Sequence, residues 1–158
     1  MKGEPEIHKA FNKALAIELT AINQYFVQAK MCLNWGFAKL GKRLYDESLG
    51  EMKHADNLIE RILFLEGIPN AVGPASLNVG KDVPEILRND LHLESSGVRV
   101  YNEAIELCIS KNDAGSREIL EHILADSEAH VDWIESQLHI IATVGAERYL
   151  AEQLGGGG

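Results

Sequence analysis

Apolar residues recur along this chain every three or four positions, the spacing that aligns side chains on one face of an α-helix. Four stripes of this kind can be followed: Phe11 to Cys32, Leu40 to Leu65, Val83 to Cys108 and Leu120 to Ile141. No stretch has the sustained alternation of a half-buried β-strand. The pattern therefore predicts an all-α protein in which four long helices bury their apolar faces against one another.

The connections between the stripes differ in length. Short breaks at Asn34-Trp35-Gly36 and at 112–115 each join two stripes, whereas the segment 67–82 contains several glycines and prolines and has little periodicity. Asp82 and Glu85 have the spacing of a capping box, which predicts the start of the third helix. Two antiparallel hairpins joined by a long crossover between the second and third helices form a four-helix bundle.

The bundle is expected to occupy about residues 5–144. Gly145 closes the fourth stripe, a short fifth helix is expected over about 146–154, and the glycines at 155–158 are expected to form a flexible tail. A chain of 158 residues can bury a substantial core, so residues 1–158 are predicted to form a single domain.

Composition narrows the class of partners. The formal net charge of -9 argues against a nucleic-acid partner and favours attraction of metal cations. Neither a secretory signal nor an apolar run of the ~18 residues that a membrane span needs is visible, so a cytoplasmic location without a membrane partner is expected. Cys32 and Cys108 lie far apart within apolar stripes and are expected to be reduced core residues.

Polar side chains interrupt all four stripes near the middle. Projecting the stripes inward collects Glu18, Glu47, Glu51, His54, Glu94, Ser127 and His130. Burying several unpaired carboxylates is costly unless cations neutralise them, so this group predicts a metal site. For Glu47 alone, a position at the edge of the stripe that reaches solvent is an alternative interpretation.

Carboxylates with one imidazole per metal ion suit iron or manganese better than calcium or structural zinc. A di-iron bundle uses one glutamate from each of two helices and a Glu-x-x-His motif from each of the other two. Glu18 and Glu94 supply the single carboxylates, and Glu51 with His54 supplies one complete motif.

The fourth helix carries His130 without the first carboxylate of its motif, because position 127 is a serine. Glu128 points about 100° around the helix from that position and cannot simply replace it, while Ser127 could hold a water or act as a weak hydroxyl ligand. One metal position keeps three ligands, and the other keeps Glu94, His130 and a bridge from Glu51. The second position is expected to bind iron more weakly.

A second apolar stripe on the second helix faces away from the core stripe and consists of Tyr45, Leu49, Met52, Ile59 and Leu63. A helix that is apolar on two sides must bury both, which predicts a subunit interface. Leu19, Phe26 and Trp35 of the first helix could line the same interface. Taken alone, a methionine in such a stripe is more often packing than a ligand.

Several stretches of the chain resemble the bacterioferritins, and the resemblance covers nearly the whole length. The matching stretches are Met1-Lys2-Gly3, Glu18-Leu19-Thr20-Ala21-Ile22-Asn23-Gln24-Tyr25-Phe26, Asn34-Trp35-Gly36, Glu51-Met52-Lys53-His54-Ala55-Asp56, Arg61-Ile62-Leu63-Phe64-Leu65-Glu66-Gly67 and His130-Val131-Asp132-Trp133. The resemblance implies a ferritin-like four-helix bundle. Within it, the implied ferroxidase residues are Glu18, Glu51, His54, Glu94 and His130, with Tyr25 beside the site.

The same resemblance implies a function in iron storage and detoxification. Such a chain would oxidise Fe(II) with dioxygen or peroxide at the di-iron site and store ferric mineral in a hollow shell of twenty-four subunits. Met52 would be an axial ligand of haem b, paired with the same residue of a neighbouring subunit. Haem would pass electrons during iron release, with a small ferredoxin as the expected donor.

Departures from the family's pattern leave alternatives open. Ser127 stands where the family usually has a glutamate, and Asp46 and Gly50 stand where an inner-surface histidine and aspartate are frequent; Asp46 retains a carboxylate for cations. One alternative is a haem-bearing structural subunit with impaired ferroxidase activity in a shell that contains a second subunit type. Another is a di-iron electron-transfer or oxygenase protein, although a Cys-rich rubredoxin-like segment is missing. An ordinary bundle would take up no metal.

Overall fold

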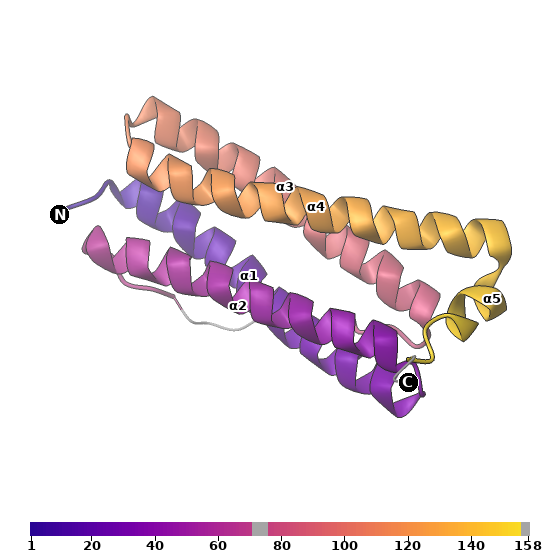
Figure 1. Ribbon diagram of the computed structural model, residues 1–158. Helices are drawn as coiled ribbons and strands as arrows, with labels where there is room; N and C mark the ends of the chain where they lie inside the picture. The colour runs from indigo at the N-terminus through magenta and orange to yellow at the C-terminus, as the bar shows by residue number, and fades with distance from the viewer. Residues whose placement is uncertain (71–75, 156–158) are drawn as a thin grey trace.

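The computed structural model describes residues 1–70 and 76–155. Its long helices are α1 (Pro5–Asn34), α2 (Ala38–Phe64), α3 (Val83–Ser110) and α4 (Ala114–Val144), and a short α5 (Ala146–Ala151) follows. The four long helices run alongside one another in an elongated bundle, and α5 lies at one end (Figure 1). This arrangement confirms the predicted all-α bundle with a short fifth helix. No helix in the described ranges is long and apolar enough to cross a membrane.

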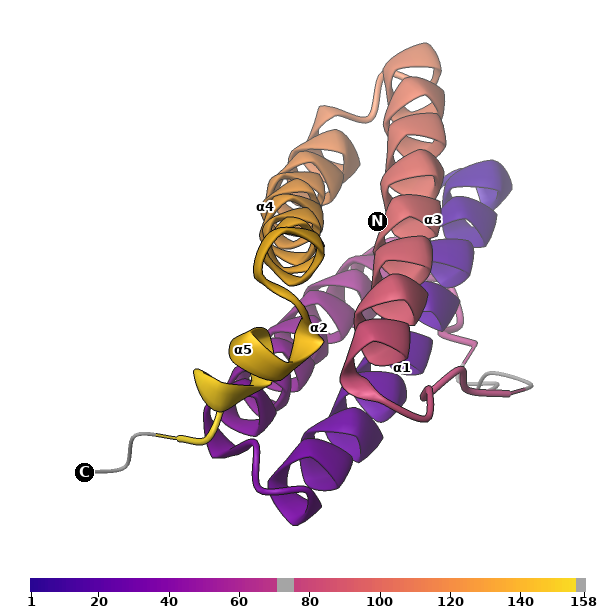
Figure 2. The same cartoon turned by 90° about the vertical axis from the view of Figure 1, so that its right-hand side faces the viewer.

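The bundle consists of two helical hairpins. Helix α1 packs mainly against α2 and α3 mainly against α4, while contacts of α1 with α3 and of α2 with α4 join the two hairpins. Figure 2 shows the two pairs from the end that α5 covers. Helix α2 ends at one end of the bundle and α3 begins at the opposite end (Figure 1). Residues 71–75 of the predicted crossover, and 156–158 of the predicted tail, lie outside the described residues.

Short-range interactions explain where the helices begin and end. The Asp82 side chain accepts a hydrogen bond from the Glu85 backbone N–H at 2.9 Å, as the capping-box spacing predicted. Asp113 caps α4 in the same way through the Ser116 N–H at 3.0 Å. Between α4 and α5, Gly145 has a φ of 91°, a conformation that other residues rarely adopt, so α4 ends there.

The apolar core consists of two clusters at different levels of the bundle. One is built around Phe11, Leu58 and Leu120 and includes Cys108. The other is built around Leu44, Leu87 and Ile134 and includes Cys32 and Tyr149, the latter from α5. Both cysteines are buried and unpaired, as predicted. The level between the clusters is occupied by polar side chains, which is where a functional site is expected.

Candidate metal centre

A layer of ionisable side chains separates the two apolar clusters, and all four long helices contribute to it. The layer consists of Glu18 of α1, Glu51 and His54 of α2, Glu94 of α3 and His130 of α4, and these residues are between 2% and 8% exposed. Glu51 and His54 share one helix face because they are three residues apart. The fold therefore brings together the five residues that the sequence singled out as metal ligands.

The first potential metal position lies between α1 and α2. One ligand atom each from Glu18, Glu51 and His54 lies within 4.8 Å of the others. His54 directs Nδ1 toward the two carboxylates, 3.1 Å from Glu51 Oε2 and 3.6 Å from Glu18 Oε2. The opposite ring nitrogen, Nε2, lies 2.9 Å from Asp126 Oδ2 of α4. The imidazole is thus oriented from behind by a carboxylate, an arrangement typical of histidines that bind metals.

The second potential position lies toward α3 and α4 and shares Glu51 with the first. Ligand atoms of Glu47, Glu51 and His130 also lie within 4.8 Å of one another. His130 Nδ1 is 2.9 Å from Glu94 Oε1 and 3.6 Å from Glu47 Oε2. The two three-residue groups share Glu51 and offer carboxylate and imidazole ligands for two cations, whereas Glu94 contacts His130 but belongs to neither group.

Two buried tyrosines support the outer carboxylates. Tyr25 donates its hydroxyl proton to Glu94 Oε1 and Tyr101 donates to Glu18 Oε1, each at 2.5 Å. Each phenol holds one oxygen of its glutamate in place. The sequence pattern placed Tyr25 beside the site through family resemblance, but it treated Tyr101 only as an apolar stripe member.

Burial and mutual repulsion set the charges of the layer. Burial raises the pKa of Glu51 well above its usual range, and the neighbouring Glu18 and Glu94 raise it further. Burial lowers the pKa of His54, but the nearby carboxylates of Glu18 and Asp126 outweigh this and raise it to about 9. For Glu94, burial is outweighed by His130, which lowers the carboxyl pKa below its usual value.

Protons therefore partly neutralise the layer when no cation is present, and a metal ion would displace them. The remaining polar atoms also fit a cation. Glu18 Oε2 is buried and has no hydrogen-bond partner among the described residues. A buried carboxylate oxygen without a donor is costly, and a divalent cation would satisfy it. Carboxylate oxygens with one imidazole at each position suit Fe(II).

Three consecutive residues of α4 at the position of the missing carboxylate have different surroundings. Ser127 is buried and faces the layer, Glu128 is exposed, and Asp126 contacts His54. Sequence reasoning missed Asp126, whose only signal was its position next to an inward-facing residue. Asp46, another predicted cation ligand, lies outside the layer and is paired with Lys42 at 2.8 Å.

The second stripe of α2 forms an exposed apolar surface except at Ile59, which is half-buried and packs against the core. Met52 is 53% exposed, and Leu49, Tyr45 and Leu63 of the same helix are also exposed. Phe26 of α1 extends this surface, with its ring centre 6.1 Å from that of Tyr45. An exposed apolar surface of this kind is typical of a contact with another subunit or protein.

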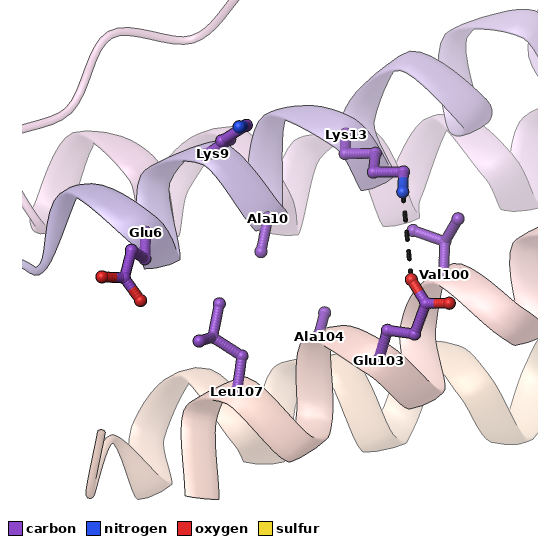
Figure 3. A pocket seen from close by; sticks show the side chains of 8 residues that line it. All are labelled: Glu6, Lys9, Ala10, Lys13, Val100, Glu103, Ala104 and Leu107. Atoms are coloured by element: carbon purple, nitrogen blue, oxygen red, sulfur yellow. Dashed lines mark ion pairs between the residues drawn. The ribbon is translucent and has the colours of Figure 1, made fainter. Parts of the chain in front are cut away.

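A groove between α1 and α3 has a different chemical character (Figure 3). Ala10, Val100, Ala104 and Leu107 give it an apolar lining, and Lys13 pairs with Glu103 at 3.9 Å across it. Neither group of potential metal ligands found among the described residues includes any of its side chains. The groove is therefore separate from the metal centre.

Comparison with known proteins identifies the family of this chain. Residues 8–144 match the ferritin-like domain family. The chain is 42% identical to a bacterioferritin of Brucella melitensis over 149 residues, which cover 94% of this chain and 92% of that protein. It is 41% identical to a bacterioferritin of Mycobacterium leprae over 152 residues, which cover 96% of each chain. It is 40% identical to a bacterioferritin of Rhodobacter capsulatus over 149 residues, which cover 94% of this chain and 92% of that protein. Similarity of this extent, together with the helical bundle and its buried Glu/His layer, places the chain in the ferritin family, among the iron-storing bacterioferritins.

Proposed function

We propose that this chain is a ferroxidase subunit that oxidises Fe(II) at the buried layer and delivers Fe(III) for storage as mineral in a hollow shell. The observation that carries the proposal is the buried layer of five potential ligands contributed by all four long helices: Glu18, Glu51, His54, Glu94 and His130. They offer two adjacent sites for iron, which is the substrate of the reaction.

Two adjacent Fe(II) ions make a two-electron reaction possible. Each ion loses one electron, and dioxygen takes up both electrons with two protons and leaves as hydrogen peroxide. With peroxide as the oxidant, the same two electrons and two protons convert it to two water molecules. Both reactions balance without a further reductant.

The side chains of the layer would hold the ions and compensate for their change in charge. Glu18, Glu51 and Glu94 would supply negative charge that favours Fe(III) over Fe(II), and Glu51, the member common to both ligand groups, would serve both ions. His54 is held by Asp126, so its Nδ1 faces the first position. His54, whose pKa is raised to about 9, would release a proton when iron binds to it.

The proposal includes the assembly and the cofactor that the family implies. Copies of the chain would form a cytoplasmic shell of twenty-four subunits, with the exposed apolar surface of α2 buried between two of them. Met52 of each of the two subunits would bind haem b, which supplies a path for electrons during iron release. A small ferredoxin would be the electron donor.

Stopped-flow measurement of Fe(II) oxidation tests the ferroxidase activity. We expect the pure protein to show a fast phase that saturates at about two iron ions per subunit, and Ser127→Glu to improve it little. Glu128→Gln serves as the matched control because Glu128 lies on the same helix but is exposed. A fast phase found only in Ser127→Glu would contradict the proposal.

That contrary result would support the second candidate function, a haem-bearing structural subunit of a mixed shell. Ser127 at the position of the missing ligand and the exposed Met52 are the observations that favour it. In that case a second subunit type would supply the oxidation, and co-assembly with it would restore the fast phase.

A further inference from the structure

The second iron position lacks the carboxylate that the Glu-x-x-His motif of α4 would supply. Ser127 is buried and occupies the inward-facing place three residues before His130. Its hydroxyl is neutral and is a weaker iron ligand than a carboxylate. Glu128, the next residue along α4, is exposed and does not belong to either ligand group. A replacement carboxylate must therefore come from another helix.

Glu47 of α2 is such a carboxylate. It lies one helical turn before Glu51, on the same face of the helix. Its Oε2 is 3.6 Å from His130 Nδ1, and its carboxylate completes the group with Glu51 and His130 in which all ligand atoms lie within 4.8 Å. The side chain is 21% exposed, so it lies at the edge of the layer rather than in solvent.

The neighbours of Glu47 fix the direction of its carboxylate. Arg43 donates from Nε to Glu47 Oε1 at 2.8 Å, which leaves Oε2 facing His130. The Arg43 guanidinium is itself held over the ring of Trp133, 4.1 Å from its centre. Trp133 in turn lies beside His130, with 6.0 Å between ring centres. Ion pairs between residues i and i+4 on a helix surface are usually mobile. Contacts that fix the orientation of a side chain, such as those of Arg43 and Trp133 around Glu47, are typical of residues around a metal ligand.

An independent observation indicates that the adjoining space takes a cation. Glu18 is 2% exposed, and its Oε2 faces His54 Nδ1 at 3.6 Å without a hydrogen-bond partner in the described parts of the chain. This unsatisfied oxygen belongs to the first position, which shares Glu51 with the Glu47 group. Two cations bridged by Glu51 would satisfy both groups.

We propose that Glu47 is a ligand of the second iron position and supplies the carboxylate that Ser127 does not. This inference rests on the proposed ferroxidase function. It assigns Arg43 the part of a positioning residue that orients Glu47. The second position then has Glu47, Glu51, Glu94 and His130 around it, so this chain can hold two Fe(II) ions despite the serine.

Anaerobic titration with Co(II), followed by its visible absorption, tests the proposal without relying on activity. The assembled wild-type particle is expected to bind about two Co(II) ions per subunit. In Glu47→Gln, we expect one Co(II) to bind as before and the affinity for the other to fall by about tenfold or more. Asp46→Asn is the matched control, because Asp46 is adjacent in sequence and also paired with a basic residue, but lies outside the layer. It should leave both affinities unchanged.

A rescue experiment separates ligation from an indirect structural effect. The double variant Glu47→Gln/Ser127→Glu should regain the second Co(II), because the motif of α4 then supplies the missing carboxylate. Gel filtration and circular dichroism would verify that each particle is assembled and helical. Failure of Ser127→Glu to restore the ion would argue that Glu47 acts through packing, and would overturn the proposal.

The outcomes also distinguish this proposal from the proposed function. Retention of both Co(II) affinities in Glu47→Gln would overturn the role of Glu47 and leave ferroxidase activity standing. Wild-type protein that binds only one Co(II) per subunit would likewise overturn it. By contrast, two-ion binding that depends on Glu47, in a protein without a fast Fe(II) oxidation phase, would support Glu47 as a ligand and contradict the ferroxidase function.

Discussion

Replacing the central carboxylate, Glu51→Gln, should stabilise the metal-free protein while removing its ability to hold two metal ions. Glu51 is 4% exposed and lies among other buried carboxylates. Glutamine has nearly the same shape and carries no charge. The change therefore removes electrostatic repulsion from the metal-free layer with little loss of packing.

The size of the effect follows from the separation of the charges. Ligand oxygens of Glu18 and Glu51 lie within 4.8 Å, and two negative charges at that distance repel by about 3.5 kcal/mol at an effective dielectric constant of about 20. Loss of the contact between Glu51 and His54 offsets part of this, but His54 keeps Glu18 and Asp126 as partners. We expect a net gain of about 1–3 kcal/mol. For a chain of this length, that gain raises the melting temperature by roughly 2–12 °C.

The gain in stability of Glu51→Gln over the wild type should increase with pH. The folded-state pKa of Glu51 is raised above its unfolded value, so the proton it holds stabilises the folded protein most at low pH. This contribution is lost as pH rises through the raised pKa, where the wild type must bury the charge and Glu51→Gln need not. The difference between the two proteins should therefore be small near pH 5 and larger near pH 8.

Differential scanning calorimetry of the metal-free particles at one scan rate measures this difference. Glu128→Gln removes the same charge from an exposed position and should leave the melting temperature nearly unchanged. Addition of Co(II) should reverse the order of wild type and Glu51→Gln, because the metal stabilises only the protein that binds it well. A metal-free Glu51→Gln variant that melts below the wild type at pH 8 would contradict the expected gain in stability from removing charge repulsion. It would mean that Glu51 contributes more as a hydrogen-bond acceptor than it costs as a charge.

Three further substitutions test other contacts of the structure. Asp126→Asn removes the charge beside His54 Nε2, so the pKa of His54 should fall from about 9. The Co(II) affinity of the first position should drop by about 10–100-fold. An unchanged titration of His54 by NMR would contradict this prediction. Tyr101→Phe leaves Glu18 Oε1 without its donor and should destabilise the metal-free protein by about 1–2 kcal/mol in thermal melts. A change near zero would mean that a water molecule replaces the hydroxyl. Met52→Leu should abolish the Soret absorption of bound haem while Fe(II) oxidation continues, and retention of haem would exclude Met52 as its ligand.

The sequence alone determined the helices and the depth of the polar layer. Apolar residues at helical spacing from Phe11 to Ile141 fixed which face of each helix is buried, because a helix places residues three and four apart on one face. The interruptions at Glu18, Glu51, Glu94 and His130 fell at matching depths, so their convergence was predictable once the bundle topology was known. The crossover and the capping box at Asp82 were predictable for the same local reasons.

Only the tertiary structure decided which side chains from different helices touch. Periodicity places Asp126 on α4 and Tyr101 on α3, but contact with His54 and Glu18 depends on the rotation and spacing of packed helices, which one stripe does not specify. The same reason applies to Glu47. Its position at the edge of its stripe is consistent either with a side chain that faces solvent or with one that faces the metal centre. Its 3.6 Å approach to His130, with Arg43 holding the other oxygen, is a property of the assembled bundle.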